Sequence, residues 1–281
     1  MQAGEAKPTQ GTDGALQEKV TVPGIRAMKG RTRITVLTAY DAITARLVDQ
    51  AGVDIILVGD SLGMVVLGYD TTLPVTMEDM IHHTRAVRRG VKRALVVADM
   101  PFGSFQGSVD RAVDNGVRLL KEGRADAVKL EGGRRVAEAV ERMVEMGIPV
   151  MGHVGLTPQS VKEFGGFKVQ GREEAERRRL LNDVQSLAEA GVFSIVIEGV
   201  PAALAAELTA AAPVPTIGIG AGPQCDGQVL VLHDMLGMVQ DFKPKFVKRY
   251  ADVAGIAIDA VRRYCDEVRR GEFPGEEHLY D

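Results

Sequence analysis

The stretch Ile55-Ile56-Leu57-Val58-Gly59-Asp60-Ser61 joins an apolar run to a polar ending. Four consecutive apolar residues predict a strand that is covered on both faces, as strands of parallel sheets are. Gly59 lets the backbone turn, and Asp60 then stands where the strand emerges from the core. A carboxylate at that point needs a cation, hydrogen bonds or water to offset its desolvation. The same pattern, an apolar strand that ends in a polar residue, recurs along the chain.

Strands and helices alternate through most of the sequence. The apolar runs predict strands at 34–38, 55–58, 95–99, 127–131, 148–153, 192–198, 216–220 and 229–232. The periodicity and capping residues between them predict helices at 41–50, 76–89, 108–122, 135–146, 173–190, 201–211 and 245–270. Thr76 with Asp79 forms an acidic variant of the capping box, and Ser108 is a good N-cap. Repeated strand–helix units imply parallel strands joined by crossover helices.

Eight such units within 281 residues fit a closed (β/α)8 TIM barrel, which is an α/β fold of one domain. The rival is an open doubly wound sheet, which would show fewer units and often a Gly-rich phosphate turn after its first strand. Leu37-Thr38-Ala39-Tyr40-Asp41 contains no such turn. We therefore expect a flexible N-terminal tail at 1–20, the barrel at 21–270 and a polar C-terminal tail at 271–281. Within the barrel, 22–25 is expected to start a short capping helix.

Composition excludes several classes of protein. The net charge of -4 and the absence of a basic face with interleaved aromatics argue against nucleic-acid binding. No uncharged apolar run approaches the ~20 residues that a membrane span needs, and the N-terminus lacks an apolar signal core. Cys225 and Cys265 are the only cysteines and form no CxxC pair, which favours a reducing cytoplasmic location over a disulfide framework or a structural zinc site.

Five successive predicted strands carry a titratable residue at their carboxyl ends, where (β/α)8 barrels place their catalytic groups. Any one of them alone would most simply be a rim residue or a helix cap, but five in register indicate a site. Clustered carboxylates repel one another unless a cation joins them. Oxygen ligands with few histidines and no cysteine nearby favour Mg²⁺ over zinc. The five residues are Asp60, Asp99, Glu131, His153 and Glu198.

Lys129 sharpens this hypothesis. The strand period of two puts Lys129 and Glu131 on the same face, while Val128 and Leu130 face the helices. A lysine inside a barrel is rare without a partner. It either forms an ion pair with Glu131 or receives a substrate carboxylate beside the metal, and we favour the second interpretation. Ser61 offers a hydroxyl and an N–H group at the same rim, which is weak evidence by itself.

Six motifs in this order resemble those of the ketopantoate hydroxymethyltransferase family. They are Leu37–Asp41, Val58–Gly63, Ala98–Gly103, Val128–Gly132, Gly152–Gln159 and Gly218–Gly222. The resemblance runs from about residue 20 to residue 270, and its specificity comes from the number and order of the motifs. No residue at the chemistry-bearing positions departs from the family pattern.

The resemblance implies transfer of a one-carbon unit from the co-substrate 5,10-methylenetetrahydrofolate to 3-methyl-2-oxobutanoate, which gives 2-dehydropantoate for pantothenate biosynthesis. Asp60, Asp99 and Glu131 would then be associated with Mg²⁺. Ser61 and Lys129 would hold the keto acid, with Asp60, Asp99 and His153 also in the substrate site, and Glu198 would be the catalytic base. His153 would contact substrate or tune a carboxylate. The family is also known for large homo-oligomers, often decamers.

Two alternatives stay open at this point. One is a Mg²⁺-dependent lyase or mutase that acts on another 2-oxo acid through an enolate. Such lyases often use a loop cysteine, and Cys225 has no base at a recognisable spacing. The other is a non-catalytic barrel that serves as an interaction scaffold, which predicts neither metal binding nor stabilisation by a keto acid.

Overall fold

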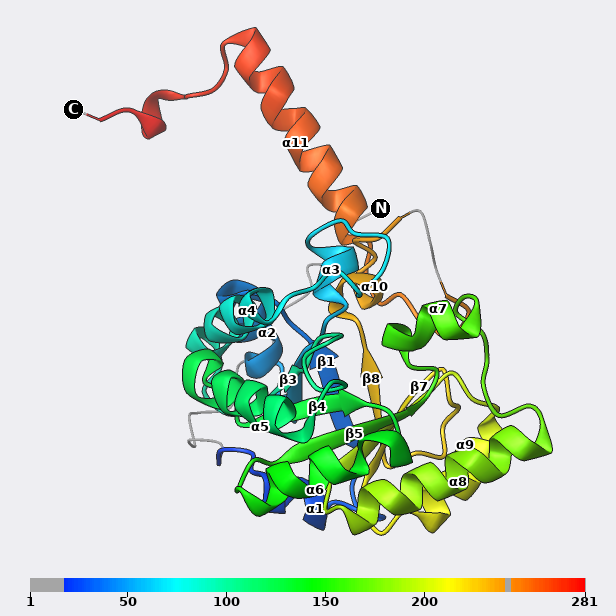
Figure 1. The fold of residues 1–281 in the computed structure, drawn as a ribbon. Coiled ribbons are helices and arrows are strands. Elements are labelled where there is room, and N and C mark those ends of the chain that lie inside the picture. Colours follow the sequence, from blue (N-terminus) through cyan, green and yellow to red (C-terminus); the bar gives the residue numbers. More distant parts are fainter. Residues whose placement is uncertain (1–17, 241–243, 281) are drawn as a thin grey trace.

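A closed barrel of eight parallel strands forms the centre of the molecule, in the order of the sequence (Figure 1). The computed structural model describes residues 18–240 and 244–280. The expected (β/α)8 barrel is confirmed, and the open doubly wound alternative is wrong because β1 pairs with β8. The strands are β1 (Ile34–Thr38), β2 (Ile55–Val58), β3 (Leu95–Asp99), β4 (Ala127–Glu131), β5 (Val150–Gly155), β6 (Ser194–Glu198), β7 (Thr216–Ile219) and β8 (Gly227–Leu230).

Helices surround the barrel and connect its strands (Figure 1). The α-helices are α1 (Val22–Ala27), α2 (Ala42–Gln50), α3 (Leu62–Val65), α4 (Met77–Gly90), α5 (Val109–Arg118), α6 (Ala137–Glu145), α7 (Val161–Phe164), α8 (Glu174–Glu189), α9 (Ala202–Ala211), α10 (Leu232–Met235) and α11 (Val253–Arg270). A π-helical turn, η1 (Leu119–Gly123), follows α5. The 3-10 turns are η2 (Arg134–Val136), η3 (Pro158–Ser160) and η4 (Glu276–His278).

Alternation along each strand produces two apolar layers. Outward-facing residues such as Ile56, Val96 and Val128 pack against the helices. Inward-facing residues such as Ile55 and Leu95 form a second core inside the lower part of the barrel. Because the two sets alternate with a period of two, every inward position of a strand is fixed once one of them is known.

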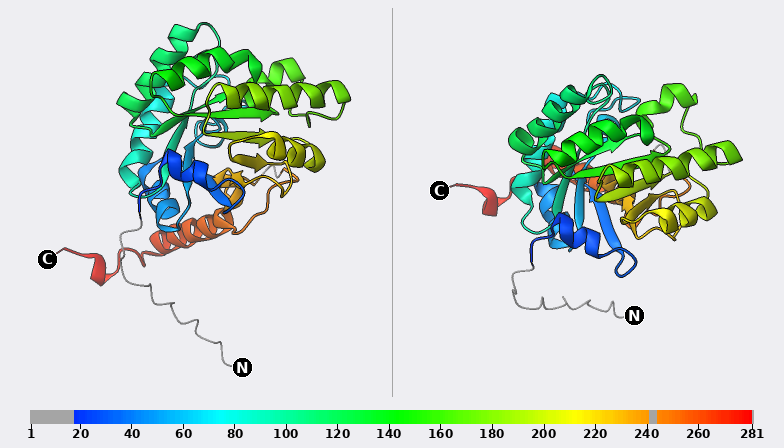
Figure 2. Two further views of the ribbon diagram at one scale, coloured as in Figure 1. Left: turned by 90° about the horizontal axis from the view of Figure 1, so that it is seen from below. Right: turned by 60° about the horizontal axis from the view of Figure 1, so that its bottom comes forward.

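The short helix α1 closes the lower opening of the barrel, as expected for the segment at 22–25. Ile25 is fully buried and belongs to the inner core. Arg26 donates to the carbonyls of Gly191 and Val192 just before β6, and Lys29 pairs with Asp226 just before β8 at 2.8 Å. The view from below in Figure 2 shows α1 in front of the strands.

The long helix α11 extends away from the barrel beyond α3 and α10 (Figure 1). None of its residues is buried. No helix in the part of the chain that the structure describes combines the length and apolar character of a membrane span.

The predicted capping residues are confirmed, whereas several predicted boundaries are wrong. Thr76 and Asp79 form the capping box of α4, and Ser108 caps α5. β8 begins two residues before the predicted start, because Gly227 and Gln228 pair with β1 although neither is apolar. The predicted helix at 245–270 begins only at Val253, where the Asp252 carboxylate accepts from the Gly255 N–H. Short α3 and η4 fall where no helix was predicted, and residues 1–17 of the predicted tail lie outside the described residues.

We expect Ile25→Ala to reduce the free energy of unfolding by ~2–5 kcal/mol, because it leaves a cavity at the barrel floor that α1 cannot fill. Urea unfolding followed by circular dichroism measures this difference. Met146→Ala is a control, since Met146 is 55% exposed and its truncation should cost less than about 0.5 kcal/mol. Equal effects of the two substitutions would contradict the role assigned to α1.

Candidate active site

Strand register brings the predicted residues together at the upper end of the barrel. Asp99 of β3 lies opposite Lys129 of β4, and Glu131 lies opposite His153 of β5. All four face the interior, and each is at most 7% exposed. Glu198 ends β6, and its side chain is 18% exposed. The side chains from β3 to β6 therefore form one cluster.

Lys129 pairs with Asp99 of the adjacent strand and not with Glu131 of its own strand. Its Nζ lies 2.6 Å from Asp99 Oδ1, whereas no ion pair with Glu131 forms. The register explains this result, because Asp99 is the direct neighbour on the adjacent strand. Asp99 Oδ2 accepts from the backbone N–H of Asp60 at 3.0 Å. Asp99 thus joins Lys129 to the end of β2.

His153 lies between two carboxylates. Its Nδ1 is 3.5 Å from Glu131 Oε1, and its Nε2 is 3.2 Å from Glu198 Oε2. Gly155 permits this arrangement, because a side chain there would collide with the carbonyl oxygen of Glu198, and the backbone at Gly155 has a positive φ. The close approach of β5 and β6 sets Glu198 beside His153. His153 therefore lies between the carboxylates of Glu131 and Glu198.

Ser61 precedes α3 at the end of β2, and its hydroxyl is 2.8 Å from the hydroxyl of Tyr40. Tyr40 follows β1 and is buried, and its backbone carbonyl lies 2.7 Å from Nδ1 of His83. Burial raises the pKa of Tyr40 above its usual range, so its hydroxyl keeps its proton as a hydrogen-bonding group. No local sequence pattern indicates this contact, because Tyr40 and Ser61 follow different strands.

Gln159 is the second residue that sequence reasoning missed. It lies in η3 beyond β5, is 5% exposed, and donates from its side-chain Nε2 to Asp60 Oδ2 at 2.9 Å. Its backbone N–H donates to Glu131 Oε2 at 2.9 Å. The one available sequence signal is a glutamine that follows a predicted strand within a few residues, and that signal is weak.

The cluster is strongly coupled electrostatically. Burial raises the pKa of Asp60 well above its usual value, and the charges of Asp99 and Glu131 raise it further. Burial also opposes the charge of Lys129, but the three carboxylates outweigh it and raise the pKa of Lys129. The pKa of Glu131 is lowered, because His153, Lys129 and the Gln159 N–H together outweigh its burial. Lys129 is therefore a permanent cation among buried carboxylates.

The donor set fits a hard divalent cation. In the part of the chain that the structure describes, no group of three or more acidic, histidine or cysteine side chains stands in ready metal-binding geometry. Asp99 Oδ1 nevertheless makes no hydrogen bond of normal geometry and faces only Lys129. The pKa of Asp60 is raised first by its burial and then by the negative charges of Asp99 and Glu131, and Lys129 lowers it only in part. Carboxylate oxygens in a negative site are the ligands that Mg²⁺ prefers.

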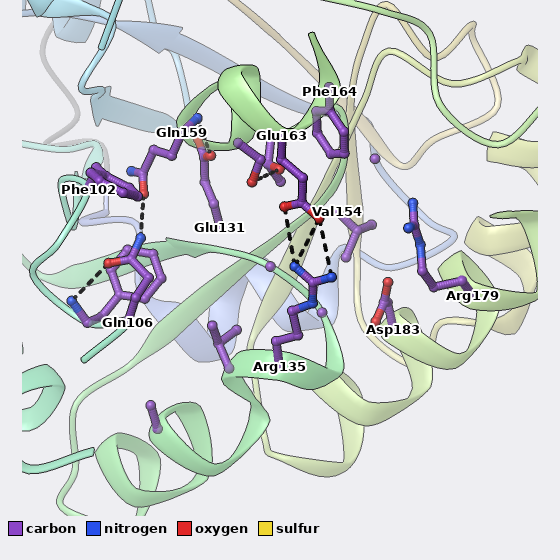
Figure 3. A pocket seen from close by; sticks show the side chains of 18 of the residues that line it. Phe102, Gln106, Glu131, Arg135, Val154, Gln159, Glu163, Phe164, Arg179 and Asp183 are labelled. Carbon is purple, nitrogen blue, oxygen red and sulfur yellow. Dashed lines mark hydrogen bonds and ion pairs between the residues drawn. The ribbon is translucent and has the colours of Figure 1, made fainter. Parts of the chain in front are cut away.

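A cavity of about 690 Å³ lies behind the cluster, between the loops after β3, β4 and β5 and the helix α8 (Figure 3). It shares Glu131 and Gln159 with the cluster, and none of the other predicted site residues lines it. Arg135 and Glu163 pair across it at 3.4 Å. We locate the chemistry at the carboxylate cluster rather than in this cavity, because the inward-facing titratable groups meet there.

The fold and this cluster define a (β/α)8 barrel enzyme with an acidic site at the carboxyl ends of its strands. Solved structures of phosphonopyruvate hydrolase (15% identical, covering 93% of this chain and 92% of that one, TM-score 0.59) and oxaloacetate acetylhydrolase (14% identical, covering 92% and 90%, TM-score 0.59) share the architecture. At this identity the likeness shows the fold alone.

Sequence comparisons are more specific. Residues 19–276 match the ketopantoate hydroxymethyltransferase family. A 3-methyl-2-oxobutanoate hydroxymethyltransferase from Moorella thermoacetica is 60% identical over 95% of this chain and 99% of its own length. One from Syntrophobacter fumaroxidans is 59% identical over 94% of each chain. The chain belongs to the ketopantoate hydroxymethyltransferase family and is therefore an enzyme of the transferase class, which argues against both the scaffold and the lyase alternatives.

The charge of His153 should make stability depend on pH. Burial and Lys129 lower its pKa, but the contacts with Glu131 and Glu198 raise it from 6.5 to about 9. A group whose pKa is higher in the folded state stabilises the fold fully at pH values below its pKa in the unfolded chain. This contribution is lost as the pH rises through its pKa in the folded state. The free energy of unfolding should fall by on the order of 3 kcal/mol between pH 6.5 and about 9.

Urea unfolding without added divalent cation, repeated across this pH range, tests the expectation. The His153→Gln variant should lack most of the decline, and the difference between the two chains isolates the histidine. A decline of the same size in both chains would show that His153 is not the titrating group.

Proposed function

We propose that this enzyme transfers a hydroxymethyl group from 5,10-methylenetetrahydrofolate to 3-methyl-2-oxobutanoate, with 2-dehydropantoate as the product for pantothenate biosynthesis. The observation that carries the proposal is the pairing of a buried lysine and acidic cluster with a base candidate, Glu198, on a separate strand. This arrangement suits a substrate that must be anchored by its carboxylate at one point and deprotonated at another. The names of the relatives support the same substrate.

Lys129 and Ser61 hold the keto acid in this proposal. The ammonium group of Lys129 lies in a low-dielectric interior, where its attraction for the substrate carboxylate is strong. Ser61 adds a hydroxyl group that the contact with Tyr40 keeps in place. Both residues stand beside Asp60 and Asp99, so the anchored end of the substrate lies next to the acidic cluster.

Asp60 and Asp99 would hold a Mg²⁺ ion, with Glu131 as the third carboxylate of the set. When bound, the cation supplies a Lewis acid that stabilises negative charge on the oxygen of the keto group. Asp60 is placed for this role by Asp99, which accepts from its backbone N–H at 3.0 Å. Asp60→Ala should therefore abolish measurable binding of the cation.

Glu198 removes the proton from C3 of the keto acid. Its carboxylate lies 3.2 Å from His153 Nε2, so a charged His153 attracts it and keeps it close to the interior of the barrel. The proton moves from C3 to Glu198, and C3 then forms a bond to the methylene carbon of the folate. A water molecule supplies the hydroxyl group of the product as the bonds from that carbon to the two folate nitrogens break. The proton taken from C3 and the second proton of the water end on these nitrogens, and tetrahydrofolate leaves. A base on β6 and an anchor on β4 reach the substrate from different directions, as this division of roles requires.

Exchange of the C3 proton with deuterium, followed by NMR in D₂O with Mg²⁺ and without folate, tests the base. We expect Glu198→Gln to slow exchange by about 10²–10⁴-fold, the range that general bases contribute. Glu207→Gln on α9 is the matched control and should exchange at the normal rate. Normal exchange by Glu198→Gln would overturn the assignment. Exchange without folate-dependent formation of 2-dehydropantoate would instead favour the lyase or mutase chemistry.

We also infer that copies of the chain associate through α11, and we retain the decamer implied by the family resemblance. One face of α11 carries Val261, Tyr264 and Val268, which are 60%, 55% and 45% exposed. Ile43 and Leu47 form an apolar stripe on α2 and are 72% and 61% exposed. Among the described residues, β8 is followed by the four-residue α10 rather than by a long outer helix. If α11 of a second copy packed against α2, the apolar face of α11 and the apolar stripe of α2 would cover each other.

Val261→Asp should weaken this association, because it places a charge in the apolar face of α11. Analytical ultracentrifugation should show a smaller species than for the unmodified chain. Arg262→Asp changes the next residue along the helix, which lies outside the apolar face formed by Val261, Tyr264 and Val268, and should leave the mass unchanged. Identical sedimentation of all three proteins would contradict an interface at α11.

The two cysteines support the proposed reducing, cytoplasmic location. Cys225 is buried and Cys265 is half-buried, and both are free thiols.

A further inference from the structure

Three carboxylates of the site, those of Asp60, Asp99 and Glu131, each have one oxygen committed to an N–H group of the protein. Asp99 Oδ2 accepts from the backbone of Asp60. The other two commitments are both made by Gln159, through its side chain to Asp60 Oδ2 and through its backbone to Glu131 Oε2. The second oxygen of each carboxylate points to a charged group or, for Asp60, has no hydrogen-bond partner among the described residues.

The orientation of the Gln159 amide is fixed from both sides. Its Nε2 donates to the carbonyl of Met100 at 2.9 Å as well as to Asp60, so the nitrogen must face the cluster. Its oxygen accepts from Gln106 Nε2 at 3.1 Å, on the cavity side. Figure 3 shows Gln106 and Gln159 joined in this way beside Glu131. The oxygen of Gln106 in turn accepts from the Gly103 N–H at 2.8 Å.

The backbone at Gln159 is held equally firmly. Gln159 is the central residue of η3, which begins at Pro158 and is closed by the Ser160 N–H to the Thr157 carbonyl at 2.8 Å. The hydroxyl groups of Thr157 and Ser160 lie 2.9 Å apart. A rigid turn beyond β5 therefore reaches across to side chains from β4 and from the end of β2.

We propose that Gln159 is a positioning residue, which holds Asp60 so that it presents a single oxygen to the divalent cation and holds Glu131 in place beside His153. This inference rests on the proposed function, because the cation is part of that proposal. A carboxylate that turned freely could pair with another charged side chain or bind the cation through both of its oxygens. Hydrogen bonds that orient metal ligands prevent this. Gln159 is suited to the task because it is neutral, and a cation in its place would neutralise the acidic site.

Replacement of Gln159 by methionine tests the inference, since it keeps the size of the side chain and removes all three of its side-chain hydrogen bonds. The backbone bond to Glu131 remains. We expect the Kd for Mn²⁺ or Mg²⁺, measured by titration calorimetry, to rise by about 10–100-fold. Gln106→Met leaves the bonds from Gln159 to Asp60 and Met100 in place, removes the support behind the amide together with the bonds from the Gly103 and Phe105 N–H groups, and should raise the Kd less. Gln170→Met is the matched control, because Gln170 is also buried in this loop but its side chain hydrogen-bonds only to the Lys168 carbonyl.

Two further measurements separate positioning from general damage. The rise in melting temperature caused by the cation should shrink in Gln159→Met, while the melting temperature without cation should match that of Gln170→Met. The slow C3 exchange of Gln159→Met should recover when the cation concentration is raised by the same factor as its Kd. A merely structural role would lower stability in both conditions and would show no recovery.

A Kd within about twofold of the unmodified chain for a folded Gln159→Met would overturn the inference. If that variant did not fold, an unchanged Kd for Gln106→Met would overturn it, because the amide would then need no support. Failure of the unmodified chain to bind either cation would instead overturn the proposed metal site, and the role of Gln159 with it.

Discussion

The burial of charge at the carboxyl end of the barrel is the constraint on which the rest of the structure depends. Lys129, Asp99, Asp60 and Glu131 are almost fully enclosed, and none of them could be left without a partner. Removing one member of a buried ion pair typically costs ~3–5 kcal/mol, because the other charge remains in a low-dielectric interior. The barrel can bury these charges because strand register places Asp99 beside Lys129 and Glu131 beside His153, so each charge has a partner. The same enclosure strengthens every charge interaction that a bound keto acid would make.

The apolar lower half of the barrel makes that enclosure possible. Inward residues such as Ile55 and Leu95 fill the interior below the charges, and Ile25 of α1 closes the floor. Water is thereby kept from the lower side of the cluster, and the site opens only toward the ends of the strands. Loops complete it from above: Tyr40 holds Ser61, and Gln159 holds Asp60 and Glu131. A packed scaffold thus supplies rigidity, while residues beyond the strand ends orient the reacting groups.

Local patterns in the sequence predicted most of the fold and the members of the cluster. The period of two correctly assigned Lys129 and Glu131 to the interior, because side-chain direction is a property of one strand. The same reasoning offered an ion pair with Glu131 as the less favoured alternative for Lys129. The structure pairs Lys129 with Asp99 instead, because register between strands is set by packing that a single strand does not encode. The beginning of β8 was missed for a similar reason: Gly227 is required where its strand approaches the carbonyl of Ile34, and a glycine carries no strand signal. Gln159 and Tyr40 act across distant segments, so no local pattern reveals them.

The central claim is that the buried cluster binds a divalent cation and a keto acid together, with Lys129 at the substrate carboxylate. A crystal structure with Mg²⁺ and 3-methyl-2-oxobutanoate tests it most directly. The account predicts the cation on oxygens of Asp60 and Asp99, the two oxygen-bearing groups of the keto acid beside it, the carboxylate at Lys129 and Ser61, and C3 facing Glu198. A keto acid found in the cavity behind Gln159, or a cation bound away from Asp60 and Asp99, would contradict the account.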